Sequence, residues 1–395
     1  MAGALRYVSV EERRARLGLR HRLASGTRAA TAAEVARDLV ALHSTDPASV
    51  FLSVNARTWA AEPAGIEGAL YEERSLIRLL GMRRTVFVVP TELAPVVQAA
   101  CTRGIATRER RRFVQVLAAA GIGDGSGAWL AEVEEATVRA LLARGEATGA
   151  ELSQDVPGLR TRILQAEGKA YQTVTNISTR VLFLLAADGR IVRGRPRGSW
   201  ISSQYRWSPA DAWLPGGMAD VPPEQARAEL VRAWLAAYGP GSAADIKWWT
   251  GWTMGEVRRV LAGIGAAEVT LDGAVGYVLA TDLEPVPAPE PWVALLPALD
   301  PTVMGWTGRE FFLGGHGPAL FDRSGNPGPT IWYDGRIVGG WAQRGSGEIA
   351  YRLLEDVGAE AATAIGAEAA RLTGWLGEVR VTPRFRTPLE RELSA

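Results

Sequence analysis

The sequence predicts an α+β fold in which three tandem winged-helix domains precede a C-terminal β-rich domain. Three successive segments each read as helix, helix, helix and then two short strands around a turn, which is the element order of a winged helix. Beyond residue 285 short strand patterns dominate until an alanine-rich helix near the C-terminal end. A chain of 395 residues has room for two to four domains, and we place the boundaries at 1–125, 126–218, 219–285 and 286–395.

The first segment has two helix-entry signals and one strong stop signal. Ser9 with Glu12, and Thr31 with Glu34, have the spacing of a capping box. The helix that starts after Thr31 is predicted to continue through Leu42, and the proline at position 47 ends it, so that residues 43–46 form a turn. Two helices, 47–58 and 63–73, and two strands, 75–80 and 84–89, complete the unit.

The second and third segments repeat this order. Helices are predicted over 129–143, 148–155 and 171–187, followed by strands at 191–193 and 199–205 that bracket an arginine-rich tip. The third segment has helices over 223–238, 242–250 and 253–263 and a ribbon around Asp272-Gly273. The glycine-rich stretch 121–127 is interpreted as a linker, because it follows no strand and no Lys-Ser/Thr pair follows it.

The C-terminal domain is predicted mainly from strands. These are 293–296, 311–313, 330–333 and 337–341, with a possible edge strand at 378–381 after the helix over 357–376. Asp334-Gly335 between two strands is a strong signal for a type I′ hairpin.

Composition narrows the chemistry. The net charge is +1, so no global basic field indicates a nucleic-acid partner, although a local basic face is possible. Only two of the 44 basic residues are lysines, which leaves 44 − 2 = 42 arginines and few candidates for a covalent imine. One cysteine and three scattered histidines predict no disulfide, no metal site and no cofactor. With no run of 18 apolar residues and no signal peptide, we expect a cytoplasmic protein.

The four residues His43-Ser44-Thr45-Asp46 place an imidazole, two hydroxyls and a carboxylate between apolar segments. Such a group can hold a water molecule or stabilise a developing cation. A turn in which the side chains only satisfy backbone groups is the structural alternative.

Five pieces of the chain resemble the AlkZ/YcaQ-like winged helix-turn-helix superfamily of DNA glycosylases, which remove bulky alkylpurines and unhook interstrand crosslinks. In chain order they are LVALHSTDP with FLSVNARTW, GMRRTVFVVP, ELVRAWLAAYGPGSAADIKWWTG, LLPALDPTVMGW and DGRIVGGW. The resemblance implies three tandem winged helices around a concave DNA-binding surface, with a C-terminal β-rich domain. It therefore agrees with the fold expected from the element order.

The resemblance also implies a catalytic pair. In the family it lies in a motif of Gln, a spacer, then Gln or Asp, with a proline close behind. Here the motif falls on His43-Ser44-Thr45, so that His43 replaces the first Gln and Thr45 the second polar residue. A free imidazole titrates near pH 6.5 and could orient or deprotonate water. We assign His43 to the water, and Thr45 with Asp46 to orientation and charge.

DNA-contact candidates are basic or aromatic residues on the predicted wings and in the third unit. They are Arg83, Arg84, Arg193, Arg195, Arg197, Lys247, Trp248 and Arg336. The expected partner is double-stranded DNA carrying an alkylated purine, acted on by a monomer that hydrolyses the base without a lyase step. Two alternatives remain: a non-catalytic DNA-binding regulator, and a scaffold that binds proteins.

Overall fold

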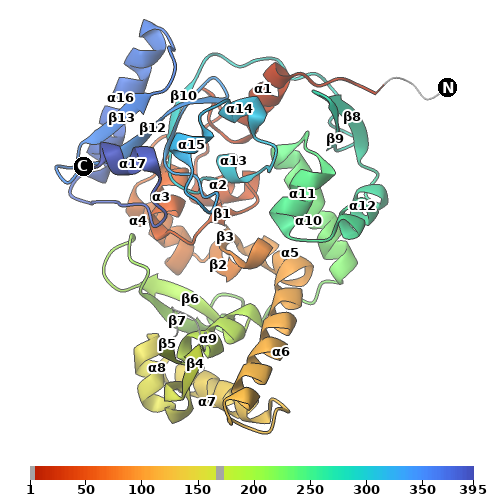
Figure 1. Cartoon of the computed structure of the whole chain (residues 1–395), viewed down its shortest axis with the longest axis vertical. Coiled ribbons are helices and arrows are strands. Elements are labelled where there is room, and N and C mark those ends of the chain that lie inside the picture. The colour runs from red at the N-terminus through yellow and green to blue at the C-terminus, as the bar shows by residue number, and fades with distance from the viewer. Residues whose placement is uncertain (1–4, 166–172) are drawn as a thin grey trace.

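The computed structural model describes residues 5–165 and 173–395, which mix helices with small antiparallel sheets (Figure 1). The first two helices are α1 (Val10–Arg20) and α2 (Ala32–Asp38). Both start as predicted, because the side chains of Ser9 and Thr31 accept hydrogen bonds from the backbone N–H groups of Glu12 and Glu34.

The first unit closes around a three-stranded sheet of order β1-β3-β2. Its elements are β1 (Leu42–His43), α3 (Pro47–Asn55), α4 (Pro63–Glu67), β2 (Leu76–Leu80) and β3 (Val86–Pro90). The helix predicted to reach Leu42 ends at Asp38, and Val40 takes a left-handed φ of 64°. That prediction was wrong because a short apolar run fits a buried strand as well as a buried helix. Leu42 and His43 pair with Val88 and Phe87 of β3.

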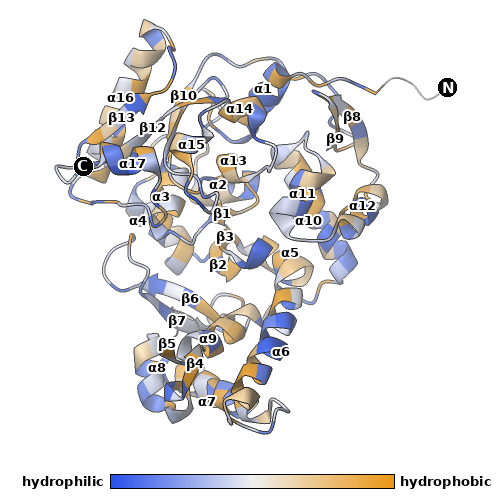
Figure 2. Ribbon diagram, in the orientation of Figure 1, coloured by the Kyte–Doolittle hydropathy of each residue, from blue (hydrophilic) through white to orange (hydrophobic). Residues whose placement is uncertain are grey.

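A long helical segment leads from the first unit to a separate lobe. It consists of α5 (Ala94–Val97) and α6 (Arg103–Ala119), with a π-helical turn at Gln98–Thr102 between them. Figure 1 shows α6 descending to the lobe, and Figure 2 shows blue and orange residues along the length of this helix. The lobe contains α7 (Ala128–Arg144), α8 (Gly149–Asp155), β4 (Arg162–Gln165), β5 (Thr173–Asn176), α9 (Ser178–Ala187), β6 (Ile191–Pro196) and β7 (Tyr205–Pro209).

Two predictions for this lobe need correction. The helix predicted over 171–187 begins only at Ser178, since 173–176 forms β5 against β4; residues 171 and 172 lie outside the described residues. The β-branched run at 173–175 favours a strand, and its partner β4 was not predicted. The strand predicted at 199–205 lies instead at Tyr205–Pro209, and Trp200 in the preceding loop stacks on Phe51 of α3 with ring centroids 4.8 Å apart.

The third unit and the C-terminal region follow. The third unit has α10 (Pro223–Tyr238), α11 (Ala243–Thr250), α12 (Met254–Gly263), β8 (Ala267–Leu271) and β9 (Ala274–Val278). The C-terminal sheet has the order β10-β11-β12-β13, from β10 (Val293–Leu296), β11 (Thr330–Tyr333), β12 (Arg336–Gln343) and β13 (Ile349–Leu353). Around it lie α13 (Pro301–Met304), α14 (Glu310–Leu313), α15 (Gly317–Leu320), α16 (Ala359–Leu376) and α17 (Pro388–Leu393).

The predicted Asp334-Gly335 hairpin is confirmed, with both residues at positive φ as a type I′ turn requires. The strand predicted at 311–313 is wrong: these residues belong to α14, where Phe311 and Phe312 pack against Trp306. The edge strand predicted at 378–381 is also wrong. There the N–H of Val381 donates to the Gln343 side chain rather than to a strand ladder.

The molecule has two main hydrophobic cores. Among the described residues, one core, the joint core, joins the first unit, the third unit and the C-terminal region, and it includes Val192, Trp200 and Trp213 from the β6–β7 part of the lobe. The other core lies within the lobe around residues such as Leu141, Leu152 and Leu185. Arg57 of the first unit and Asp300 of the C-terminal region form a fully buried ion pair, with 2.7 Å between Nη2 and Oδ1. No helix among the described residues is both long and apolar enough to cross a bilayer.

Candidate active site

His43 lies on β1 under the turn that connects β2 to β3. Its side chain is 6% exposed, and its ring meets the edge of Phe87, its register partner on β3, at a centroid distance of 5.3 Å. Burial, followed by the positive charge of Arg83, lowers the pKa of His43 to about 3, so the ring is neutral at pH 7. Its Nδ1 is buried without a hydrogen-bond partner among the described residues. Of the predicted turn, only His43 lies in a strand, whereas Ser44, Thr45 and Asp46 form the connection to α3. The buried Nδ1 of His43 is left unpaired among the described residues.

Ser44 fixes the motif to the sheet. Its N–H donates to the carbonyl of Val86 at 2.9 Å, and its Oγ accepts a 2.7 Å hydrogen bond from Nε of Arg78 on β2. Arg78 is 3% exposed, donates from Nη1 to the Tyr71 hydroxyl at 3.1 Å, and lies 4.5 Å above the Tyr205 ring. Sequence reasoning missed Arg78, although a lone arginine in the otherwise apolar strand Leu76–Leu80 was a signal.

Thr45 and Asp46 differ in their side-chain hydrogen bonds. Thr45 is half-buried, and its hydroxyl has no hydrogen bond to any described residue. Asp46 caps α3: its Oδ1 accepts from the N–H of Ala48 at 3.1 Å, and its Oδ2 accepts from the N–H of Arg384 at 3.0 Å. Burial raises the pKa of Asp46, and these two hydrogen bonds oppose the rise.

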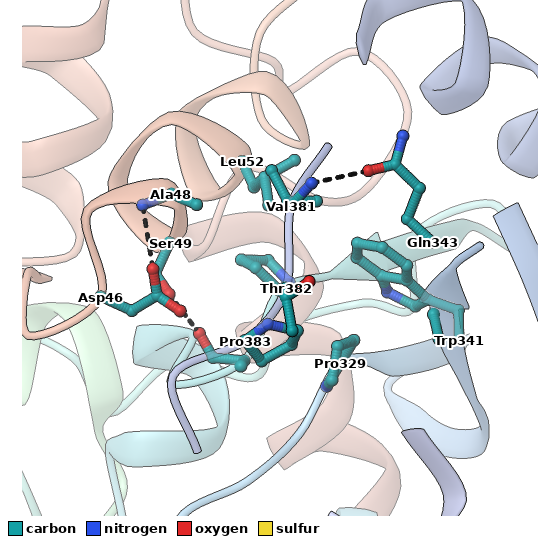
Figure 3. A pocket seen from close by; sticks show the side chains of 13 residues that line it. Asp46, Ala48, Ser49, Leu52, Pro329, Trp341, Gln343, Val381, Thr382 and Pro383 are labelled. Carbon is teal, nitrogen blue, oxygen red and sulfur yellow. Dashed lines mark hydrogen bonds between the residues drawn. The ribbon is translucent and has the colours of Figure 1, made fainter. Parts of the chain in front are cut away.

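Asp46 also borders a narrow cavity, with a volume of about 20 Å³, between α3 and the segment around Val381 and Pro383 (Figure 3). In Figure 3 a dashed line joins the Asp46 carboxylate to the backbone nitrogen of Ala48. The cavity holds about one water molecule and is too small for a nucleobase.

Two predicted DNA-contact residues from different units, Arg83 and Trp248, contact each other, and the charge of Arg83 also acts on His43. Arg83 has a left-handed φ of 52° in the β2–β3 turn, and its guanidinium carbon lies 3.9 Å from the Trp248 ring centroid on α11. Its Nε is buried without a partner among the described residues, and burial lowers its pKa. Arg309, which sequence reasoning missed, lies 5.0 Å from the same ring, and burial lowers its pKa to about 10. Lys247, on the same helix, is exposed.

The remaining candidates lie in different surroundings. Arg84 is 3.1 Å from Glu109 and borders a cavity of about 330 Å³ that Phe183 also lines. On β6, Arg193 stacks over Trp207 at 4.8 Å, whereas Arg195 is paired with two carboxylates, those of Glu67 and Glu72, each at 3.0 Å.

Two arginines stand at chain turns. Arg197 is exposed in the loop after β6. Arg336, beside the Asp334-Gly335 turn, is paired with Glu355, and a side chain on Gly335 would collide with Arg14 of α1. This hairpin therefore packs against α1 with its arginine already neutralised.

The described residues contain no group of three or more histidine, cysteine, aspartate or glutamate side chains able to hold a metal ion. What the arrangement offers is a neutral imidazole and a free hydroxyl, surrounded by arginines and aromatic rings. These groups can position a water molecule beside an anionic polymer such as DNA.

Comparisons with known proteins identify the family of the chain. The structure is similar to the Streptomyces sahachiroi DNA glycosylase AlkZ, with a TM-score of 0.72 and 20% sequence identity over 93% of this chain and 97% of that one. A search of curated protein sequences gave no match. A family model described as "DNA glycosylase AlkZ-like" matches residues 35–375. The match covers most of the chain, and the chain therefore belongs to the AlkZ-like DNA glycosylase family.

Proposed function

We propose that this protein is a monofunctional DNA glycosylase that hydrolyses the N-glycosidic bond of bulky N7-alkylguanine, or a related alkylpurine or crosslink, in duplex DNA. The observation that carries the proposal is the buried, neutral His43 with its unpaired Nδ1, at the motif position that the family resemblance marks as catalytic. Base excision repair and self-resistance to a genotoxin are the two roles that such chemistry would serve.

Hydrolysis of this N-glycosidic bond does not require a strong base, and His43 is a weak one. An N7-alkylated guanine already carries a positive charge and leaves without a strong general acid, through an oxocarbenium-like state on the sugar. Water that meets such a cation needs orientation more than deprotonation. A neutral His43 accepts a hydrogen bond from that water and adds no positive charge next to the developing cation.

The other motif residues divide the remaining tasks. We assign the free hydroxyl of Thr45 to a second hydrogen bond to the water. Asp46 acts as a positioning residue, because both carboxylate oxygens already accept backbone hydrogen bonds, from Ala48 and Arg384. Ser44 is held by Arg78, so its hydroxyl fixes the backbone direction between the two reacting side chains.

DNA is expected to lie across three tandem winged helices and to contact Arg83, Trp248 and Lys247 beside the motif. The exposed Arg197, in the loop after β6, would reach a phosphate farther along the duplex. The enzyme would work as a monomer on nucleoid DNA in the cytoplasm. Since a bulky adduct does not fit a closed pocket, recognition would occur without deep base flipping.

The decisive experiment is single-turnover release of an N7-alkylguanine from a duplex, scored as free base and as alkali-labile abasic sites. We expect the wild-type protein to release the base, His43→Ala to lose release by about 100-fold or more, and its duplex affinity to stay within about twofold. His316→Ala is the matched control, since that histidine contacts Glu355 far from the motif in sequence.

Two results would contradict the proposal. Equal loss of binding and release in His43→Ala would mean that the imidazole maintains the fold of the interface rather than the chemistry. No release from simple or bulky adducts, with duplex binding intact, would favour the non-catalytic DNA-binding regulator.

A further inference from the structure

We propose that Arg78, Arg193 and Tyr205 form a binding site for one phosphodiester oxyanion of the DNA strand, directly behind the catalytic motif. This inference rests on the proposed glycosylase function. It adds to that function a specific contact with the DNA backbone, at the place where the first unit meets the lobe. Two of its three residues, Arg78 and Tyr205, were not predicted from the sequence.

Arg78 is a buried cation without a counterion. Its side chain is 3% exposed, and its described partners are all neutral: the hydroxyls of Ser44 and Tyr71 and the face of the Tyr205 ring. Removing a guanidinium from water without a carboxylate is costly, so such an arrangement is uncommon unless an anion completes it.

A second unpaired arginine approaches from the lobe. Arg193 lies on β6, which packs against β2, the strand that bears Arg78. Its guanidinium stacks on Trp207 and has no ion pair to any described residue. Burial, and then the positive charge of Arg78, lowers its pKa to about 10, as expected for a buried cation with a like charge nearby.

Tyr205 supplies the third observation. Its hydroxyl is buried and has no hydrogen-bond partner among the described residues, while its ring supports the guanidinium of Arg78 at 4.5 Å. A buried, unsatisfied donor costs free energy until a ligand accepts its hydrogen bond. The guanidinium groups of Arg78 and Arg193 and the unused hydroxyl of Tyr205 are hydrogen-bond donors of the kind that bind phosphate oxygens.

Other arginines near this site do have carboxylate partners, unlike Arg78 and Arg193. Arg195, two residues along the strand from Arg193, is paired with Glu67 and Glu72. Arg110 on α6 and Arg190 before β6 are paired with Glu134 and Glu135 of α7. These three arginines thus have carboxylate partners from α4, from its continuation to Glu72 and from α7, whereas Arg78 and Arg193 have no carboxylate partner among the described residues.

The site has a mechanistic consequence. Arg78 donates to Ser44, whose neighbours in the chain are the two proposed reacting residues, His43 and Thr45. A phosphate that engages Arg78 would thus fix the strand relative to the water position. It would also place negative charge near the sugar cation that forms on base loss.

The test uses three variants of the full chain: Arg193→Met, Arg78→Met and Tyr205→Phe, with Arg190→Met as a carboxylate-paired control on the same hairpin. Duplex affinity is measured against salt concentration. A plot of log affinity against log salt concentration has a negative slope. We expect Arg193→Met and Arg78→Met each to make this slope less steep by about 0.9, the value for one lost phosphate contact. Tyr205→Phe, which removes no charge, should weaken binding without changing the slope, and Arg190→Met should change neither quantity.

Thermal unfolding of the free protein separates binding from structure. Arg193→Met removes an unpaired cation that has no side-chain hydrogen bond to a described residue, so its melting temperature should equal or exceed that of the wild type. An unchanged salt slope in Arg193→Met and Arg78→Met would overturn the inference, as would a large fall in the Arg193→Met melting temperature. Failure of the wild type to bind duplex DNA would instead refute the proposed function itself.

Discussion

At the scale of single residues, two buried histidines have the same ionisation but different surroundings. Burial lowers the pKa of both His21 and His43 to about 3. His21 uses both ring nitrogens, 2.9 Å from Oγ1 of Thr302 and 3.2 Å from the carbonyl of Ala237. His43 has a buried nitrogen with no described partner. The unpaired nitrogen, rather than the shifted pKa, therefore distinguishes the candidate catalytic residue.

The low pKa of His43 predicts an unusual pH profile. An imidazole that titrated at 6.5 would lose half of its neutral form at that pH, whereas one at about 3 stays neutral down to pH 5. We expect enzyme-dependent release of N7-alkylguanine to stay constant within about twofold from pH 8 to pH 5, measured in single turnover after subtracting release without enzyme. A decline with a midpoint near pH 6.5 would show that His43 titrates normally in the DNA complex.

The sequence could indicate the motif because four consecutive polar residues between apolar segments are conspicuous. It could not indicate Arg78 or Tyr205 with equal force, since their significance comes from contacts that bridge different units. The same limit applies to Arg195 and Arg336: on sequence both read as free cations on turns, and only the fold shows their carboxylate partners.

At the scale of elements, Asp46 is a helix cap with a second attachment. It caps α3 through Ala48 and also accepts a hydrogen bond from the N–H of Arg384. Thr148 is the comparison, since it caps α8 with a complete capping box in the lobe. Both are caps, but only one adjoins the motif.

We expect Asp46→Ala and Thr148→Ala each to lower the free energy of unfolding by about 1 kcal/mol, measured by urea denaturation. Only Asp46→Ala should reduce base release, because only this cap positions His43 and Thr45. Asp46→Asn should retain most of the release, since an amide oxygen still accepts one backbone hydrogen bond. Complete loss in Asp46→Asn would assign a catalytic role to the charge.

Element prediction succeeded where local chemistry decides the outcome. Caps at Ser9 and Thr31 and the Asp334-Gly335 turn each depend on a few adjacent residues, and all were predicted. It failed at β1 and β5, whose strand identity depends on partners elsewhere in the fold, on β3 and β4. The most informative error was β1, because this strand carries His43.

At the scale of the whole molecule, the helices of the lobe pack in a hydrophobic core distinct from the one that joins the first unit, the third unit and the C-terminal region. Leu185 on α9 is fully buried within the lobe core. Truncating such a residue to alanine costs about 2–5 kcal/mol, and the loss should remain within the lobe.

We therefore expect Leu185→Ala to speed hydrogen exchange of amides in α7, α8 and α9 while amides in β11 and β12 keep their protection, as measured by mass spectrometry. Leu296→Ala, at a fully buried position on β10 in the joint core, should produce the opposite pattern. Uniform loss of protection in both variants would mean that the two cores unfold as one cooperative unit.

The hydrogen bond from Arg384 to Asp46 also sets an order of events during protein synthesis. Its two residues are 338 positions apart. At about 5–20 residues per second, a ribosome needs roughly 17–68 s (338/20 to 338/5) to produce the second residue after the first. The strand that carries His43 can thus pair with β3 well before Arg384 is made, whereas the hydrogen bond from Arg384 to the neighbouring carboxylate must wait until then. During that interval a nascent chain would hold a motif in which Asp46 lacks this second attachment.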